Sequence, residues 1–208
     1  MSKIPETTSD PSLGFSERHW AAEPDIPALA EARKLKSTSP KSAIRSFELL
    51  AEKGSIFSLI HLGQIYSQGL GVKADAKIAE QYYTEADQKG SIYGSYYLSL
   101  LYIRQKNMIR ARIFLEKCVE QGFAPALHKL GRIYYNGWGV KRDVKRAMKL
   151  WKQGVSMGNI LSNVSLGLAY VRFRGGPSKF ITGFELIISS IRRYSQVLQA
   201  DPGSDLLK

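Results

Sequence analysis

Apolar residues recur at spacings of three and four along most of the chain, a pattern typical of helices with one buried face. Residues 56–67 and 124–135 show this pattern, and each run ends at a Gly-x-Gly sequence that breaks a helix. An aspartate, Asp75 or Asp143, follows each break, where its carboxylate can accept the free amide hydrogens of a second helix. Each stretch therefore predicts two helices joined by a turn.

This helix pair repeats along the chain. Glycines close successive amphipathic runs at separations of 36, 32 and 36 residues, at Gly54, Gly90, Gly122 and Gly158. A period of this size is one supersecondary unit, and such units stack into solenoids. We therefore expect an all-α, right-handed superhelical solenoid of helix-turn-helix repeats. The expected domains are a flexible N-terminal tail over 1–25, units over about 26–54, 55–90, 91–122, 123–158 and 159–194, and a C-terminal tail over 195–208.

Two of the units carry a specific motif. The sequences LGQIYSQGLGVKADAKIA and LGRIYYNGWGVKRDVKRA resemble the Sel-one-like repeat family, whose members are relatives of the tetratricopeptide repeats. The unit 91–122 departs from the motif, because it has Ser99 in place of glycine and is four residues shorter. The last unit keeps Gly167 but replaces the second half of the turn with RFRGGPSKF, and its second helix is expected at about 178–194. The resemblance implies an adaptor or scaffold role.

Glycine inside a helix costs roughly 1 kcal/mol relative to alanine, so a helical glycine indicates close packing of a neighbouring helix. Each glycine of the Leu-Gly pair is followed one turn later by a tyrosine, which we interpret as a packing residue rather than a base-stacking one. The predicted structural residues are Gly63, Gly131, Gly167, Tyr66, Tyr134 and Tyr170.

The resemblance also assigns certain first-helix positions to the inner, concave wall of the superhelix, and here these positions are unusually apolar. A contiguous exposed apolar surface marks a binding site or a hidden intramolecular contact. The alternative is a tight superhelix whose inner wall is core, and the N-terminal tail with Trp20 is a candidate occupant of an open groove. The candidate groove residues are Phe57, Ile60, Gln64, Tyr93, Tyr96, Leu100, Ile103, His128, Arg132 and Tyr135.

Charge is distributed unevenly along the chain, which has a formal net charge of +12. Residues 1–90 contain eleven Lys and Arg and twelve Asp and Glu, whereas 91–208 contain nineteen and six, a net charge of +13. A solvated face, a surface for an acidic protein partner and a surface for nucleic acid or lipid are the three interpretations of this excess. The predicted basic surface consists of Lys141, Arg142, Lys145, Arg146, Lys149 and Lys152.

Catalytic, metal and cofactor chemistry find little support in the sequence. The three histidines stand apart from one another, and there is no HExxH, CxxC or phosphate-binding loop motif. Cys118 is the only cysteine, so it cannot form an internal disulfide, and this favours a reducing, cytoplasmic compartment. It aligns with Ala86 and Gly154, which indicates a packed thiol. No apolar run reaches the roughly 20 residues of a membrane span.

The sequence therefore predicts a non-enzymatic, monomeric protein-interaction module without cofactor, metal or catalytic residues. It would bind a protein or peptide partner, acidic in one version, through the concave groove and the basic C-terminal half. A bacterial immunity protein that occludes a toxin and a nucleic-acid-associated factor that uses the basic half remain the alternatives.

Overall fold

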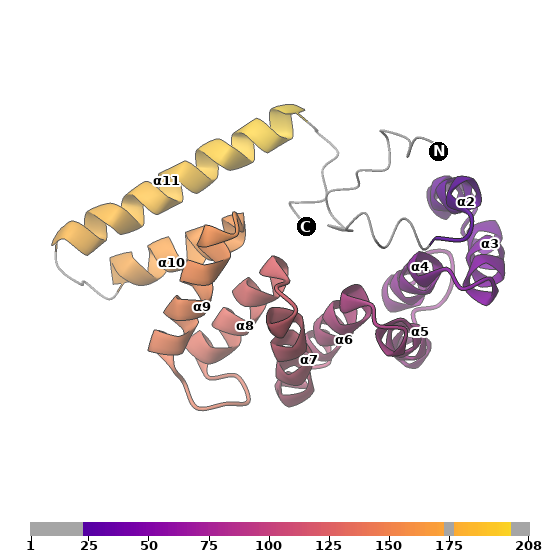
Figure 1. Ribbon diagram of the computed structural model, residues 1–208, viewed down its shortest axis with the longest axis horizontal. Helices are drawn as coiled ribbons and strands as arrows, with labels where there is room; N and C mark the ends of the chain where they lie inside the picture. The colour runs from indigo at the N-terminus through magenta and orange to yellow at the C-terminus, as the bar shows by residue number, and fades with distance from the viewer. Residues whose placement is uncertain (1–22, 173–176, 201–208) are drawn as a thin grey trace. The chain divides into compact units, whose positions relative to one another are not determined.

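The computed structural model describes residues 23–172 and 177–200, and within these residues it contains ten α-helices and no strand (Figure 1). All helices have 13 residues except the last, which has 24. They are α2 (Ile26–Thr38), α3 (Pro40–Glu52), α4 (Ile56–Gln68), α5 (Ala76–Gln88), α6 (Ile92–Arg104), α7 (Met108–Glu120), α8 (Ala124–Asn136), α9 (Val144–Ser156), α10 (Ile160–Arg172) and α11 (Pro177–Ala200).

Consecutive helices pack in pairs. Helix α2 packs on α3, α4 on α5, α8 on α9 and α10 on α11. The stacked rings of Tyr102 and Phe114, with centroids 5.7 Å apart, join α6 to α7. The prediction of an all-α fold built from consecutive helix pairs is confirmed.

The chain divides into two compact units after Cys118. The N-terminal unit contains α2 to α6 and most of α7, and the C-terminal unit contains α8 to α11. The core of the N-terminal unit joins three helices, because Leu29 of α2 and Phe47 of α3 are buried together with Leu62 of α4. The expectations for Trp20 and for both chain ends, 1–22 and 201–208, lie outside the described residues.

The helix ends follow from particular side chains. The Asp75 carboxylate accepts hydrogen bonds from the amides of Lys77 and Ile78 at 2.8 and 3.1 Å, and Asp143 accepts one from the amide of Arg146 at 2.9 Å. Both aspartates are therefore N-caps, as the sequence predicts.

The turns end the first helix of a pair in two different ways. Helices α4 and α8 end at Gly69 and Gly137, whose φ values of 73° and 71° lie in the left-handed region that glycine adopts without steric cost. The connection between α6 and α7 is shorter, over 105–107, and there Lys106 takes a φ of 60°. The missing Gly-x-Gly turn thus leaves a non-glycine residue in this conformation.

Close contact between the helices of a pair occurs at the helical glycines. A Cβ atom on Gly63 would overlap the ring of Tyr83, and one on Gly131 would overlap the indole of Trp151. In the last pair a Cβ on Gly167 would lie 2.7 Å from the carbonyl oxygen of Gly183. Each glycine therefore sits where the second helix of the pair leaves no room for a side chain.

The repeated tyrosines lie at or beside these contacts. Tyr134 is buried, and Tyr66 is half-buried with its ring stacked on that of Tyr82. Tyr170 is half-buried, and its Cβ lies 3.0 Å from the position of a Cβ on Gly183.

The C-terminal helix is longer than expected. Residues 177–200 form one helix, whereas the sequence suggests an end near residue 194 and a flexible tail after it. Residues 195–200 contain no glycine or proline, the residues that most disfavour a helix, so the helix can continue to Ala200.

We expect Gly131→Leu to lower the free energy of unfolding by roughly 1–3 kcal/mol or more, because the branched side chain would have to displace the buried Trp151 indole. Thermal and urea unfolding measure this loss. Arg132→Leu, which places the same side chain at the neighbouring exposed position, is the control and should change stability little. Equal unfolding curves for Gly131→Leu and wild type would contradict the close contact.

Candidate interaction surfaces

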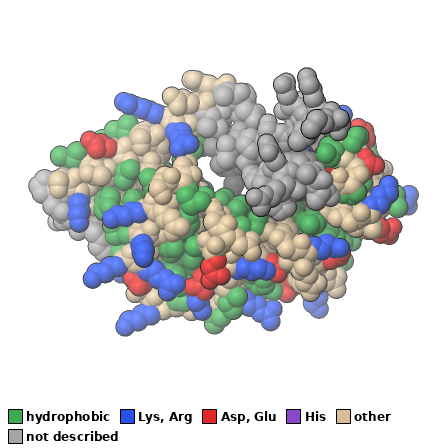
Figure 2. All heavy atoms as spheres, in the orientation of Figure 1, with side chains coloured by type: hydrophobic (Ala, Val, Ile, Leu, Met, Phe, Trp, Pro, Cys, Tyr) green, Lys and Arg blue, Asp and Glu red, His purple; other side chains and the backbone are tan. Residues whose placement is uncertain are grey.

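The basic residues predicted from the sequence lie on the accessible side of α9 and on the turn before it. All six are exposed, whereas Ala147, Trp151 and Gly154 on the opposite side of α9 are buried. Lys145, Lys149 and Lys152 lie along one stripe about 10 Å long, because their spacings of four and three match the helical turn. Figure 2 shows Lys and Arg side chains gathered over the region where Figure 1 places α9 and this turn.

The arginines of this region are held on aromatic rings. The Arg146 guanidinium carbon lies 4.1 Å from the centroid of the Tyr134 ring, and that of Arg142 lies 5.6 Å from the Tyr135 ring. Arg142 also donates a hydrogen bond from Nε to the carbonyl oxygen of Tyr135 at 2.9 Å. Cation–π contacts of this kind restrict the guanidinium to a defined position.

Two residues predicted for the groove join the basic residues. Tyr135 lies under Arg142, and Arg132 lies over the ring of Trp138 with a guanidinium-to-centroid distance of 5.4 Å. The sequence separates these residues into two sites, but the folding of α9 back along α8 brings them together. We call the combined set the α8–α9 surface, and it comprises Arg132, Tyr135, Trp138, Lys141, Arg142, Lys145, Arg146, Lys149 and Lys152.

The electrostatic environment of the α8–α9 surface is strongly positive. Asp143 is the only acidic residue between positions 124 and 156, and its carboxylate is engaged as the N-cap of α9. Burial lowers the pKa of Lys129, and the positive charge of Arg132 lowers it further. The pKa of His128 falls to about 4, first because of burial and then because of Lys129 and Arg132. Nearby cations thus oppose the addition of further positive charge.

Several other predicted groove residues belong to the core. Phe57, Ile60 and Tyr93 are 3%, 0% and 3% exposed, and His128 is 7% exposed. At these positions the inner-wall side chains fill space between neighbouring helices, so they do not line an accessible groove. Gln64, Tyr96, Leu100 and Ile103 are half-buried and keep part of their surface accessible.

Gln64 is the centre of a polar network that the sequence does not reveal. Its Nε2 donates to the Tyr97 hydroxyl at 2.8 Å, and its Oε1 accepts from Lys36 Nζ at 3.4 Å. The His61 Nδ1 atom lies 3.3 Å from the same oxygen. These side chains come from α2, α4 and α6, and no local motif in the sequence links residues so far apart.

The histidines have the environment of core residues. His61 is buried, and its ring stacks on Phe47 with centroids 4.9 Å apart. Burial lowers the pKa of His61 to about 3, and the charges of Lys36 and Arg33 act in the same direction. Among the described residues no cluster of His, Cys, Asp and Glu could hold a metal ion.

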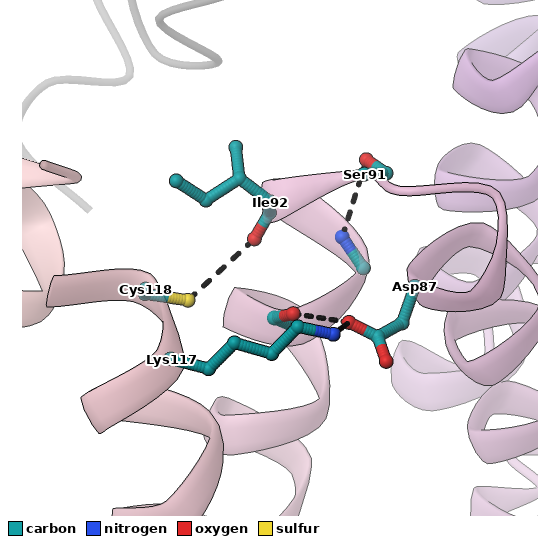
Figure 3. A network of polar contacts seen from close by, with 7 residues as sticks. Asp87, Ser91, Ile92, Lys117 and Cys118 are labelled. Carbon is teal, nitrogen blue, oxygen red and sulfur yellow. Dashed lines mark hydrogen bonds and ion pairs between the residues drawn. The ribbon is translucent and has the colours of Figure 1, made fainter. Parts of the chain in front are cut away.

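Cys118 is buried in a polar network at the junction of α5, α6 and α7 (Figure 3). Its thiol lies 3.6 Å from the carbonyl oxygen of Ile92, to which it can donate a weak hydrogen bond. Lys117 Nζ donates to the Asp87 carboxylate at 2.6 Å, and Ser95 Oγ donates to the same oxygen. Burial, followed by the charge of Asp87, raises the pKa of the Cys118 thiol to about 12.

Consecutive helix pairs, three of which have a glycine at the close contact between their helices, define a helical-repeat scaffold. The family model of the Sel1 repeat matches residues 56–91 and 124–159, which contain the pairs α4–α5 and α8–α9. These two segments of the chain are therefore Sel1 repeats. Sel1 repeats form helical scaffolds that typically serve protein interaction and are generally non-catalytic.

Solved structures with a similar fold include the following three. A Sel1 repeat protein from Oxalobacter formigenes is 19% identical with a TM-score of 0.66, covering 90% of this chain and 84% of that one. MamA is 21% identical with a TM-score of 0.59, covering 83% and 98%. The c5321 protein, a protective antigen of uropathogenic Escherichia coli strains with an SLR fold, is 24% identical with a TM-score of 0.60, covering 73% and 33%.

A curated plant protein is similar in sequence. The ERAD-associated E3 ubiquitin-protein ligase component HRD3B of Arabidopsis thaliana is 30% identical over 101 residues. The match covers 48% of this chain and 16% of the plant protein. None of the described helices has the length and apolar character needed to cross a bilayer.

We expect the Cys118 thiol to be inert in the folded protein. With a pKa of about 12, only about one thiol in ten thousand is ionised at pH 8, and the side chain is fully buried. Reaction with a disulfide reagent should therefore be slow in buffer and complete in urea. Equal rates in the two solvents would contradict this environment.

We expect stability to fall as the pH drops below about 6.5, because the unfolded chain then binds a proton that folded His61, with a pKa of about 3, does not. Above about pH 6.5 His61 is neutral in both states and causes no loss. Below it, the free energy of unfolding falls by about 1.4 kcal/mol per pH unit. Urea titrations at pH 7 and pH 5 measure this loss. His61→Leu should reduce it, and the same pH dependence in wild type and variant would contradict the assignment.

Proposed function

We propose that the chain is a protein-interaction module that binds an acidic segment of a partner protein on the α8–α9 surface. The observation that carries this proposal is the arrangement of six exposed cations on α9 and its turn; Asp143, the one acidic residue in the sequence from 124 to 156, is already used as a helix cap. Lys141, Lys145, Lys149 and Lys152 form no ion pair with another described residue. Their charges are therefore available to a ligand.

The geometry suits carboxylates. Arg142 and Arg146 are positioned by tyrosine rings, and a guanidinium held in place can bind a carboxylate through two parallel hydrogen bonds. Lys145, Lys149 and Lys152 repeat at four and three residues, so a partner helix with Asp or Glu at the same spacing would place one carboxylate near each lysine. The most suitable ligand is therefore an acidic helix or an acidic strand of similar length.

Nucleic acid fits this surface less well. Proteins that bind single-stranded nucleic acid combine cations with accessible aromatic faces on which bases stack. Here one face of each ring is occupied by an arginine, namely Arg146 on Tyr134, Arg142 on Tyr135 and Arg132 on Trp138. The aromatic rings thus position cations and are poorly placed for stacking on bases.

The relatives support a role in protein assembly. The plant relative is named as a component of an E3 ubiquitin-protein ligase. We extend from this only the general role of a scaffold, because the match covers 16% of the plant protein. The single buried cysteine is compatible with the reducing cytoplasm, which we propose as the compartment.

The test is fluorescence anisotropy with a labelled glutamate-rich peptide as the probe, read against a DNA oligonucleotide of equal charge. Replacement of Lys145, Arg146, Lys149 and Lys152 by Gln should weaken peptide binding at least about tenfold, mainly through slower association. Circular dichroism should show unchanged helicity, because glutamine is a comparable helix former.

The matched control is the replacement of Lys41, Arg45, Lys73 and Lys77 by Gln. It also removes three lysines and one arginine, but from exposed positions of the N-terminal unit. This variant should bind the peptide like wild type. Equal weakening in both variants would show that binding depends on net charge and not on the α8–α9 surface. Tighter binding of DNA than of peptide would contradict a protein ligand.

A further inference from the structure

Helix α11 exposes a large apolar face at the end of the C-terminal unit. Six of its apolar side chains are between 37% and 62% exposed, namely Phe180, Ile181, Phe184, Ile188, Ile191 and Tyr194. Together they expose on the order of 600 Å² of largely apolar surface, which is the upper limit for a patch on an ordinary monomer. A terminal repeat needs a polar outer face to remain soluble alone.

The side chains on this face follow a heptad pattern. Ile181, Phe184, Ile188 and Ile191 are spaced by three, four and three residues, as the core positions of a two-helix coiled coil are. A different stripe of the helix packs on α10. In that stripe Gly183 approaches Gly167 closely, and Ser190 is 2% exposed. The heptad stripe is therefore left uncovered by α10.

Two charged residues lie beside the heptad stripe, and their positions indicate which partner helix would fit it. Glu185 and Arg192 are seven residues apart, so they occupy the same edge of the heptad stripe two turns apart. Neither forms an ion pair with another described residue. The opposite edge carries the apolar Phe180, Ile187 and Tyr194.

We propose that α11 pairs with α11 of a second copy of this chain, in antiparallel orientation. When two identical helices pack antiparallel, the same edges face each other. Glu185 then meets the partner's Arg192, and Arg192 meets the partner's Glu185, so one surface supplies two ion pairs. In a parallel pair this charged edge would face the apolar edge that contains Ile187, and neither charge would gain a partner.

The size of the face is adequate for such a dimer. A standard stable interface buries about 800 Å² on each partner, and the apolar stripe with its flanking charged edge approaches this area. The pairing also extends the repeat architecture, because the last helix of one copy covers the last helix of the other. The inference is independent of the proposed function, since α11 contributes no residue to the α8–α9 surface.

Sedimentation velocity of the full chain over a concentration series up to about 200 µM tests the pairing. We expect a dimer whose dissociation constant rises at least about tenfold in Ile188→Glu, because the change places a charge at the centre of the apolar stripe. Thr182→Glu adds the same charge at an exposed polar position of α11, ten residues from Arg192, and is the control. Circular dichroism checks that both variants stay folded. A wild-type chain that is monomeric over this range, or a dimer indifferent to Ile188→Glu, would overturn the proposal.

A charge exchange tests the orientation. Glu185→Arg and Arg192→Glu should each weaken the dimer about tenfold, because like charges then face each other across the pair. The double variant should regain the wild-type affinity, and a mixture of the two single variants should form a heterodimer with two restored ion pairs. A dimer that is disrupted by Ile188→Glu but indifferent to these exchanges would exclude the antiparallel arrangement.

Discussion

The close approach of a large side chain on the second helix to a glycine on the first helix is the contact on which the pairs α4–α5 and α8–α9 depend. Tyr83 lies over Gly63, and Trp151 lies over Gly131 at the equivalent position 68 residues later. The absence of a Cβ lets the ring approach the helix backbone, and interior packing density makes any added volume costly. In the third pair Ser99 replaces the glycine, and the position equivalent to Tyr83 is the smaller Leu115. The sum of the two volumes is thus roughly maintained.

This contact also fixes which side of each second helix faces solvent. Because Trp151 must lie over Gly131, with Ala147 and Gly154 buried beside it, Lys145, Lys149 and Lys152 point outward. The same rotation of α9 places Arg142 and Arg146 over tyrosines of α8. The proposed interaction surface is therefore a consequence of the packing of α9, and no separate element is required to form it.

The first and last helix pairs of the described chain differ in how much of their apolar surface is buried. The first pair buries Leu29 and Phe47 together with Leu62 of the next helix, so its apolar residues are used within the N-terminal unit. Helix α11 packs on α10 where Gly183 approaches Gly167, and six apolar side chains on another side of α11 stay accessible. Hydrophobic burial, which dominates folding energetics, is incomplete at this end of the C-terminal unit.

The sequence by itself determined the helix pairs, their period, the capping aspartates and the basic stripe, because each depends on residues within one turn or one repeat of each other. The tertiary structure decided which inner-wall residues are accessible, since the burial of Phe57, Ile60 and Tyr93 depends on helices distant in the chain. It also joined Arg132 and Tyr135 to the basic residues of α9. Periodicity indicates which side of a helix is apolar, but only the packing of neighbouring helices determines whether that side is covered.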